Sequence, residues 1–195
     1  MKARHPILGR LALAVSGPST AGESYLKGAV GEEKLGAALE EAAGEGVFVI
    51  HDRRRPRTTA NIDHLVVGPN GVWVIDAKRY SGTVTKADRG GWFQTDLRLI
   101  VGGRDRTQLV AAVHKQVADV EGVLAAAGLG GVTVRGALCF IDADWRLFAK
   151  PFEIDGVLIA WGEALRDRMC APGPFPVEER SLVRDVLLRG LPSAN

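Results

Sequence analysis

The sequence has few of the features that mark secreted, zinc-thiolate or membrane proteins. Its two cysteines, Cys139 and Cys170, form no CxxC pair, which argues against a thiolate zinc site and against a disulfide framework. No apolar run approaches the roughly 18 residues that a transmembrane helix needs. Near the N-terminus Arg10 interrupts the apolar stretch, so we expect no signal peptide. The sequence therefore predicts a cytoplasmic protein without a membrane partner.

The chain also has almost no excess of one charge over the other, and it has few aromatic residues. The 195 residues carry a formal net charge of only +2, so nucleic-acid binding would have to come from a local basic patch. Aromatic residues make up 6% of the chain, and the tryptophans are scattered rather than interleaved with basic residues. They are therefore interpreted as core or edge packing; they are Trp73, Trp92, Trp145 and Trp161. No GxxxxGK[ST] phosphate loop or GxSxG nucleophile motif is present.

The apolar pattern predicts one α/β domain with a central mixed sheet flanked by helices. Hydrophobic residues form 46% of the chain, enough for a sizeable core. Residues 1–22 are expected to form a basic, loosely ordered lead-in, 23–170 the domain, and 171–195 a helical extension packed on it. The predicted strands are 47–51, 62–78 as a hairpin, 81–86, 91–101, 132–141 and 156–161. The predicted helices are 24–43, 107–127, 163–169 and 177–189.

The hairpin "IDHLVVGPNGVWVIDAK" (62–78) places one aspartate in each apolar strand. If Pro69 and Asn70 form a two-residue loop, Asp63 lies opposite Asp76 and the two carboxylates repel each other. A glycine bulge in the turn would instead shift the register and separate them. In the opposed register, replacing Asp76 by asparagine is expected to relieve this repulsion and to preserve or raise the melting temperature.

Two converging carboxylates are suitable ligands for a hard cation such as Mg²⁺ or Mn²⁺. Lys78 would reach the same region and stabilise negative charge. The alternative is a pair of surface carboxylates on an edge hairpin, with Lys78 as an ordinary counter-ion. The first helix favours the metal site, because Glu32 shares the apolar stripe of Leu35 and Leu39 whereas Glu33 falls on the solvated face.

These residues resemble the nuclease-related domain (NERD) family, which is related to the PD-(D/E)xK nucleases. The stretches that carry the resemblance are "GAVGEEKLGAAL", "NIDHLVVGPNGVWVIDAK" with "YSGTV", and "HKQVADVEGVL". The family's motifs match Gly31-Glu32, Ile62-Asp63-His64 and Asp76-Ala77-Lys78, and its helical glutamine would be Gln116. The resemblance spans roughly residues 25–165. Many members carry glutamate at the position of Asp76.

The resemblance implies a restriction-endonuclease-like core and metal-dependent hydrolysis of phosphodiester bonds in DNA, with RNA as an alternative substrate. It implies that Mg²⁺ or Mn²⁺ is the cofactor, without an organic small molecule. The implied metal ligands are Glu32, Asp63 and Asp76, and Lys78 and Gln116 complete the implied catalytic set. The alternative function is a catalytically inactive nucleic-acid-binding or protein-interaction module of the same fold. The oligomeric state is not predicted.

The basic run "HDRRRPR" (51–57) precedes the strand that carries Asp63. Arginine forms bidentate contacts with phosphate, so this run is predicted to bind nucleic acid, although a solvated loop is the alternative. The predicted contacts are Arg53, Arg54, Arg55, Arg57 and Arg79. His64 should point to the opposite strand face from Asp63, as a packing residue or as a partner of the site.

Overall fold

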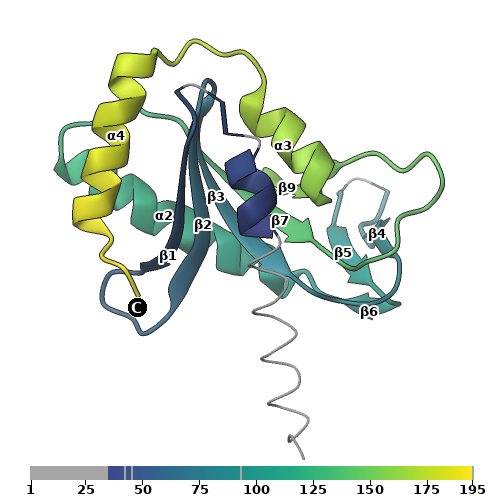
Figure 1. The fold of residues 1–195 in the computed structure, drawn as a ribbon. Coiled ribbons are helices and arrows are strands. Elements are labelled where there is room, and N and C mark those ends of the chain that lie inside the picture. Colours follow the sequence, from purple (N-terminus) through teal and green to yellow (C-terminus); the bar gives the residue numbers. More distant parts are fainter. Residues whose placement is uncertain (1–34, 42, 45, 93, 195) are drawn as a thin grey trace, which may run out of the picture.

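The computed structural model describes residues 35–41, 43–44, 46–92 and 94–194. Residues 35–41 are helical. The strands are β1 (Phe48–Arg54), β2 (Asn61–Gly68), β3 (Gly71–Lys78), β4 (Val84–Asp88), β5 (Leu97–Val101), β6 (Arg104–Asp105), β7 (Val134–Phe140), β8 (Phe152–Ile154) and β9 (Val157–Ala160). The helices are α2 (Gln108–Ala126), α3 (Gly162–Cys170) and α4 (Val177–Gly190) (Figure 1).

The central sheet has six strands in the order β1-β2-β3-β7-β9-β8. Strands β1, β2 and β3 are antiparallel neighbours, β3, β7 and β9 run parallel, and β8 returns antiparallel to β9. The connection from β3 to the parallel β7 passes through a smaller sheet, β4-β5-β6, and then α2. The predicted α/β fold with a central mixed sheet flanked by helices is therefore confirmed.

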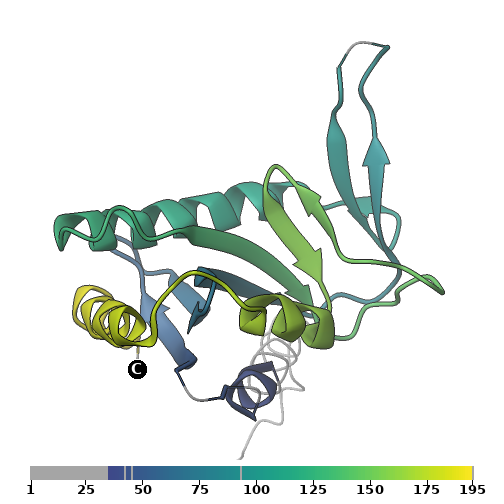
Figure 2. The same ribbon diagram turned by 90° about the horizontal axis from the view of Figure 1, so that it is seen from above.

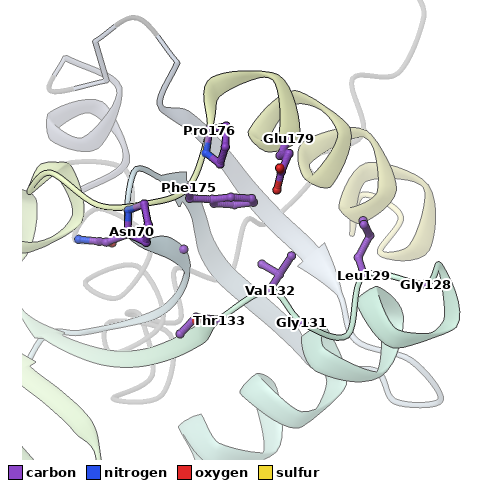
Figure 3. Close-up of a pocket in the computed structure, with 11 residues that line it drawn as sticks. Asn70, Gly128, Leu129, Gly131, Val132, Thr133, Phe175, Pro176 and Glu179 are labelled. Atoms are coloured by element: carbon purple, nitrogen blue, oxygen red, sulfur yellow. The ribbon is translucent and has the colours of Figure 1, made fainter.

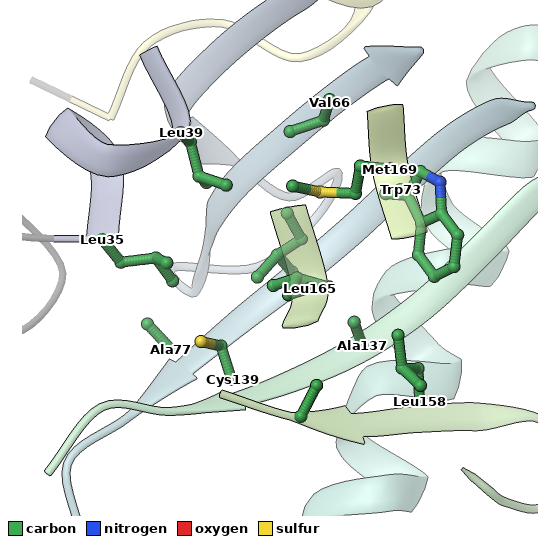
Figure 4. Packing of buried hydrophobic residues seen from close by; sticks show 12 residues of the cluster. Leu35, Leu39, Val66, Trp73, Ala77, Ala137, Cys139, Leu158, Leu165 and Met169 are labelled. Carbon is green, nitrogen blue, oxygen red and sulfur yellow. The ribbon is translucent and has the colours of Figure 1, made fainter. Parts of the chain in front are cut away.

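Helices cover both faces of the central sheet (Figure 2). On one face, Leu35 and Leu39 of the first helical segment pack with Leu165 and Met169 of α3 over Ala77 and other strand residues (Figure 4). On the other face lies α2, whose buried residues recur every three or four positions, as an amphipathic helix requires. Helix α4 packs against α2, β1 and β2. In the described part of the chain no helix is long and apolar enough to cross a membrane.

The β2–β3 hairpin has the register expected from its turn. Gly68 pairs with Gly71 around Pro69 and Asn70, and the pairing continues to His64 opposite Ile75. Asn70 fixes this turn, because its side chain accepts a hydrogen bond from Trp73 Nε1 (2.8 Å) and donates one to the Arg168 carbonyl (2.7 Å). The register therefore brings Asp63 and Asp76 to the same level, at the end of the hairpin away from the turn.

The start of β5 and the two shortest strands differ from the predicted elements. Strand β5 begins at Leu97 rather than at residue 91, and residues 89–92 and 94–96 lie in the connection of the β4–β5 hairpin. The pattern also missed β6 and β8, which contain two and three residues. Segments this short carry no usable periodicity, so only their partners on neighbouring strands reveal them.

Candidate functional site

Strands β2 and β3 change their mode of pairing beside Asp63. Backbone pairing between the two strands runs from the turn to His64 and Ile75. Beyond that point the backbone N–H of Ala77 donates to Asp63 Oδ2 at 2.8 Å. A carboxylate thus satisfies a backbone donor that a strand carbonyl would otherwise pair. This contact places the Asp63 side chain directly beside the last residues of β3.

Asp76 is buried and ion-paired with Lys78. The Asp76 residue is 5% exposed, and Lys78 Nζ lies 2.8 Å from each carboxylate oxygen. Burial alone would lower the pKa of Lys78, but the charges of Asp76 and Asp63 raise it above its usual value. The ammonium is therefore influenced by both carboxylates, and the structure brings Asp63, Asp76 and Lys78 together.

The surroundings of this cluster differ from those of an edge hairpin. The β2–β3 pair lies inside the sheet, between β1 and β7, and Asp76 pairs with Leu138 of the parallel β7. The alternative of two surface carboxylates is therefore wrong for Asp76. The same alternative treated Lys78 as a counter-ion, and Lys78 does form an ion pair with Asp76. A carboxylate buried in the middle of a sheet is costly unless paired, which makes the cluster unusual for a purely structural position.

Gln116 lies on the sheet-facing side of α2. It is 6% exposed and follows Val113 in the buried stripe of the helix. Leu138, the strand neighbour of Asp76, packs with Val113, so Gln116 and Asp76 belong to the same side of the sheet. A Cβ on Gly136 of β7 would lie 2.5 Å from Val113 Cγ1, so a glycine is needed for this close approach of α2. Within the described residues, the buried Gln116 Oε1 has no hydrogen-bond partner.

Replacing Gln116 by methionine should therefore stabilise the protein, and it should impair the DNA hydrolysis that the family resemblance implies if Gln116 takes part in that reaction. Methionine keeps the length of the side chain and removes a buried acceptor whose desolvation is uncompensated, for a gain of about 1 kcal/mol. If Gln116 instead serves only packing, stability should fall or stay constant without a change in activity. Thermal unfolding and DNA cleavage, measured on the same preparation, separate these outcomes.

The implied third ligand, Glu32, and its neighbour Glu33 lie outside the described residues. Among the described residues, no group of three or more histidine, cysteine, aspartate or glutamate side chains is arranged to hold a metal ion. Leu35 and Leu39, which defined the apolar stripe, pack on Ala77 and thus on the face opposite Asp76. The expectation that Glu32 joins the strand carboxylates stays a prediction.

The basic run is only partly available for a ligand. Arg55 Nε donates to Asp119 Oδ2 of α2 at 2.6 Å, and Arg54 Nη2 donates to the Ala194 carbonyl at 3.0 Å. Arg57 is exposed and has a positive φ of 58°. Arg53 is partly buried, and Arg79 forms an ion pair with Asp142. The run precedes β2 and thus lies at the same end of the hairpin as Asp63, but its role in nucleic-acid binding stays a prediction.

His64 points away from Asp63, as strand alternation predicts. It is 4% exposed, and its Nδ1 lies 2.8 Å from Nδ1 of His51. His51 Nε2 in turn lies 3.0 Å from Glu40 Oε1. These contacts connect β2 and β1 to the helical segment on the opposite face of the sheet from Asp76. His64 therefore acts in packing this helix, on the far side of the sheet from the carboxylate cluster.

Two further features were not recognised in the sequence. Trp92 is 99% exposed, so its interpretation as a packing residue is wrong; its place among glycines in "RGGWF" was the available signal. A cavity of about 470 Å³ lies between the β2–β3 turn and the N-terminus of α4, lined by Asn70, Val132, Phe175, Glu179 and neighbours (Figure 3). It is at the opposite end of the hairpin from Asp63 and contains no cluster of carboxylates.

The sequence of this chain is similar to a known protein family over more than half of its length. The model of a family described as "Nuclease-related domain" (NERD) matches residues 27–141, which include Asp63, Asp76, Lys78 and Gln116. One similar curated protein, from Streptomyces coelicolor, is named "Probable kinase PglW". It is 34% identical over 98 residues, which are 49% of this chain but only 6% of that protein. The similarity therefore concerns a small part of a much larger protein.

Proposed function

Because the chain belongs to the nuclease-related domain family, we propose that it hydrolyses phosphodiester bonds in DNA with the help of a divalent metal ion. The observation that carries the proposal is the buried Asp76, held by Lys78 and adjacent to Asp63. A carboxylate pair with one lysine provides the two things that phosphodiester hydrolysis needs from a protein. These are oxygen ligands for a cation and a positive charge for the developing phosphorane.

The donor set fits Mg²⁺ or Mn²⁺. Mg²⁺ is usually bound through one or two carboxylates, with waters and substrate phosphates completing its coordination. Asp63 and Asp76 would supply the carboxylates, and Glu32 is the proposed third. The Oε1 of Gln116, which has no hydrogen-bond partner among the residues that the structure describes, is a further hard oxygen acceptor on the same side of the sheet. A bound cation would polarise the scissile phosphate and lower the pKa of a water.

Lys78 and Gln116 have distinct proposed roles. The Lys78 ammonium is protonated at neutral pH, as the ordinary lysine pKa already requires, and it can donate hydrogen bonds to a phosphate oxygen. It would turn from Asp76 toward the substrate when a cation takes over the charge of that carboxylate. Gln116 would accept a hydrogen bond from a water or a substrate group through its Oε1. Asp63 remains fixed by the Ala77 N–H.

Cleavage assays test the proposal directly. We would incubate pure protein with linear duplex, circular duplex and single-stranded DNA, each with Mn²⁺, with Mg²⁺ or with EDTA. The proposal predicts cleavage of at least one DNA with metal and none with EDTA. Binding of DNA without cleavage in any metal would instead favour the inactive nucleic-acid-binding module. An absence of both binding and cleavage would favour a protein-interaction module.

Arg54 and Arg57 are the exposed members of the basic run and should contribute salt-sensitive affinity for DNA. Each phosphate contact releases condensed counterions, so replacing both arginines by glutamine should reduce the slope of log affinity against log salt by up to about 2. The matched control is the double replacement of Arg166 and Arg168, which are exposed on α3 beside the β2–β3 turn. If the slope of log affinity against log salt is equal in wild type and in both double variants, the basic run makes no contact with DNA.

A further inference from the structure

The β4–β5 hairpin projects from the body of the protein (Figure 2). Strand β4 begins at Val84, shortly after Lys78, and the backbone N–H of Val84 donates to the Asp144 carbonyl at 2.9 Å. A rise of about 3.3 Å per residue then places the tip about 20 Å from this anchor. We call residues 84–101 the arm. The chain that carries Lys78 therefore continues directly into the arm.

The tip of the arm presents Trp92 in a defined turn. Asp88 Oδ1 accepts hydrogen bonds from the backbone N–H groups of Gly90 (2.8 Å) and Asp96 (2.9 Å). These two bonds lower the pKa of Asp88 and keep its carboxylate within the turn. Arg89 N–H donates to the Asp96 carbonyl at 2.9 Å and closes the tip. Trp92 itself is 99% exposed, which leaves a large aromatic surface in water at considerable cost.

The charges of the arm and its base suit a polyanion. Residues 84–106 carry five basic and three acidic side chains. The acidic side chains are engaged internally: Asp88 in the turn, Asp96 with Arg98 at 2.7 Å, and Asp105 with Thr107. Lys86, Arg89 and Arg104 are exposed.

A polar pocket lies where the arm joins the body, close to Lys78 in the chain. It has a volume of about 330 Å³ and is lined by Tyr80, Ser81, Arg104, Arg106, the last residue of β5 and Gly102 of the β5–β6 turn. Arg106 stacks over the Tyr80 ring, and its buried Nε has no hydrogen-bond partner in the described part of the chain. Two arginines and a hydroxyl around a small pocket form a suitable site for a phosphate group. The base of the arm therefore offers a suitable place for one phosphate group of a nucleic-acid backbone.

We propose that the arm guides single-stranded DNA to the carboxylate cluster, with Trp92 stacking on an unpaired base while the arginines at the arm's base hold the backbone. This inference rests on the proposed function and specifies its substrate. Stacking on an exposed aromatic side chain requires a base whose face is free, as in single strands, gaps and flaps. In a continuous duplex the bases are already stacked, so Trp92 would gain no contact there.

The test compares Trp92→Ala with wild type by equilibrium binding to a single-stranded oligonucleotide and to its duplex, both in EDTA so that cleavage does not interfere. The expected result is a loss of affinity for the single strand of about fivefold to a hundredfold, with little change for the duplex. The slope against salt should stay constant, because no phosphate contact is lost. Trp92→Phe should retain most of the affinity. Leu182→Ala, at a 51% exposed position on α4, is the control for losing surface apolar area.

Each outcome supports or overturns the inference. Equal single-strand affinity in wild type and Trp92→Ala would overturn it, and would leave the proposed function intact if wild type still cleaves DNA. A wild type that neither binds nor cleaves DNA would overturn both. A change from dimer to monomer in Trp92→Ala, with DNA affinity preserved, would show that a second copy of the chain covers the tip instead. Because Trp92 is fully exposed, its replacement should not alter the melting temperature. An unchanged melting temperature would show that the variant is folded.

Discussion

Replacing Asp76 by asparagine is expected to reduce metal-dependent DNA cleavage by about a thousandfold or more, while the protein stays folded and binds DNA as tightly as before. The amide preserves the shape of the side chain but removes an anionic oxygen ligand, and hard cations bind neutral amides less strongly than carboxylates. Loss of metal stabilisation of the transition state is worth several kcal/mol, which sets this magnitude. DNA affinity should hold or rise because a negative charge near the substrate is removed.

The stability of the Asp76→Asn variant distinguishes two physical effects. From the sequence alone, removing one of two opposed carboxylates should relieve repulsion and preserve or raise the melting temperature. The structure changes this expectation, since Lys78 lies 2.8 Å from the Asp76 carboxylate and its charge offsets the repulsion. We now expect the metal-free variant to lose about 1–2 kcal/mol of stability, because Lys78 loses its partner.

Melting curves and cleavage rates with and without Mn²⁺ check both parts of this prediction. The control is Glu153→Gln, which removes an exposed carboxylate on β8 and should behave as wild type. If Asp76→Asn cleaves DNA at the same rate as wild type, the metal-site assignment is wrong. A collapse of the fold in the metal-free variant, with no effect of Mn²⁺ on the wild-type melting temperature, would assign Asp76 a structural role.

Replacing Lys78 by methionine should both lower cleavage and destabilise the protein. Without the ammonium, a positive charge near the phosphate is lost, at an expected cost of about a hundredfold to a thousandfold in rate. The Asp76 carboxylate, whose side chain is 7% exposed, is then left buried without its cation. Because breaking a buried ion pair leaves an uncompensated charge, we expect a loss of about 2–3 kcal/mol. Mn²⁺ should restore part of this stability by occupying the carboxylates.

The pH dependence of stability provides an independent measurement of the Lys78 ion pair. Lys78 has a pKa raised above 10.5 in the folded protein. Its contribution to stability is therefore fully present below the ordinary lysine pKa and is lost as the pH rises through the raised folded value. Wild type should thus lose stability relative to Lys78→Met when the pH exceeds about 10.5. Parallel loss in both proteins would contradict the ion pair.

Lys78→Arg separates the electrostatic from the chemical role of this residue. Arginine preserves the positive charge beside Asp76 but places it in a planar, bidentate group on a different stem. We expect most of the stability to remain while cleavage falls. Equal stability and equal cleavage in Lys78→Arg would mean that any cation at this position suffices.

Local patterns were sufficient to predict much of this fold. The alternation in β2 and β3, with glycines on both sides of Pro69-Asn70, predicted a two-residue turn with a glycine bulge as the alternative, and the structure has the register of the two-residue turn. The long amphipathic helix was predicted as 107–127 and is observed as α2, Gln108–Ala126. These features depend on neighbours in the chain, which is why one sequence reveals them. The family resemblance likewise rested on short ordered motifs, and the family match over residues 27–141 confirms the family.

Long-range contacts limited what could be predicted about the site. The burial of Asp76 depends on β7, which lies some sixty residues further along the chain and runs parallel to β3. The availability of Arg55 depends on Asp119 in α2, and that of Arg54 depends on Ala194, which is 140 residues away in the sequence. The exposure of Trp92 follows from the arm extending beyond the body. No local pattern contains these partners, so the position of the basic run in the sequence suggested that it was more available, and the scattered tryptophans suggested core or edge packing.

The location of a bound Mn²⁺ ion tests the central claim most directly. Crystals grown with Mn²⁺ would be measured at a wavelength where manganese scatters anomalously, for wild type and for Asp76→Asn. The account predicts an anomalous peak within coordination distance of the Asp63 and Asp76 carboxylates, with Lys78 no longer bound to both oxygens of Asp76, and no such peak in the variant. A wild-type crystal in which Lys78 still holds Asp76, with manganese bound elsewhere or nowhere, would contradict it.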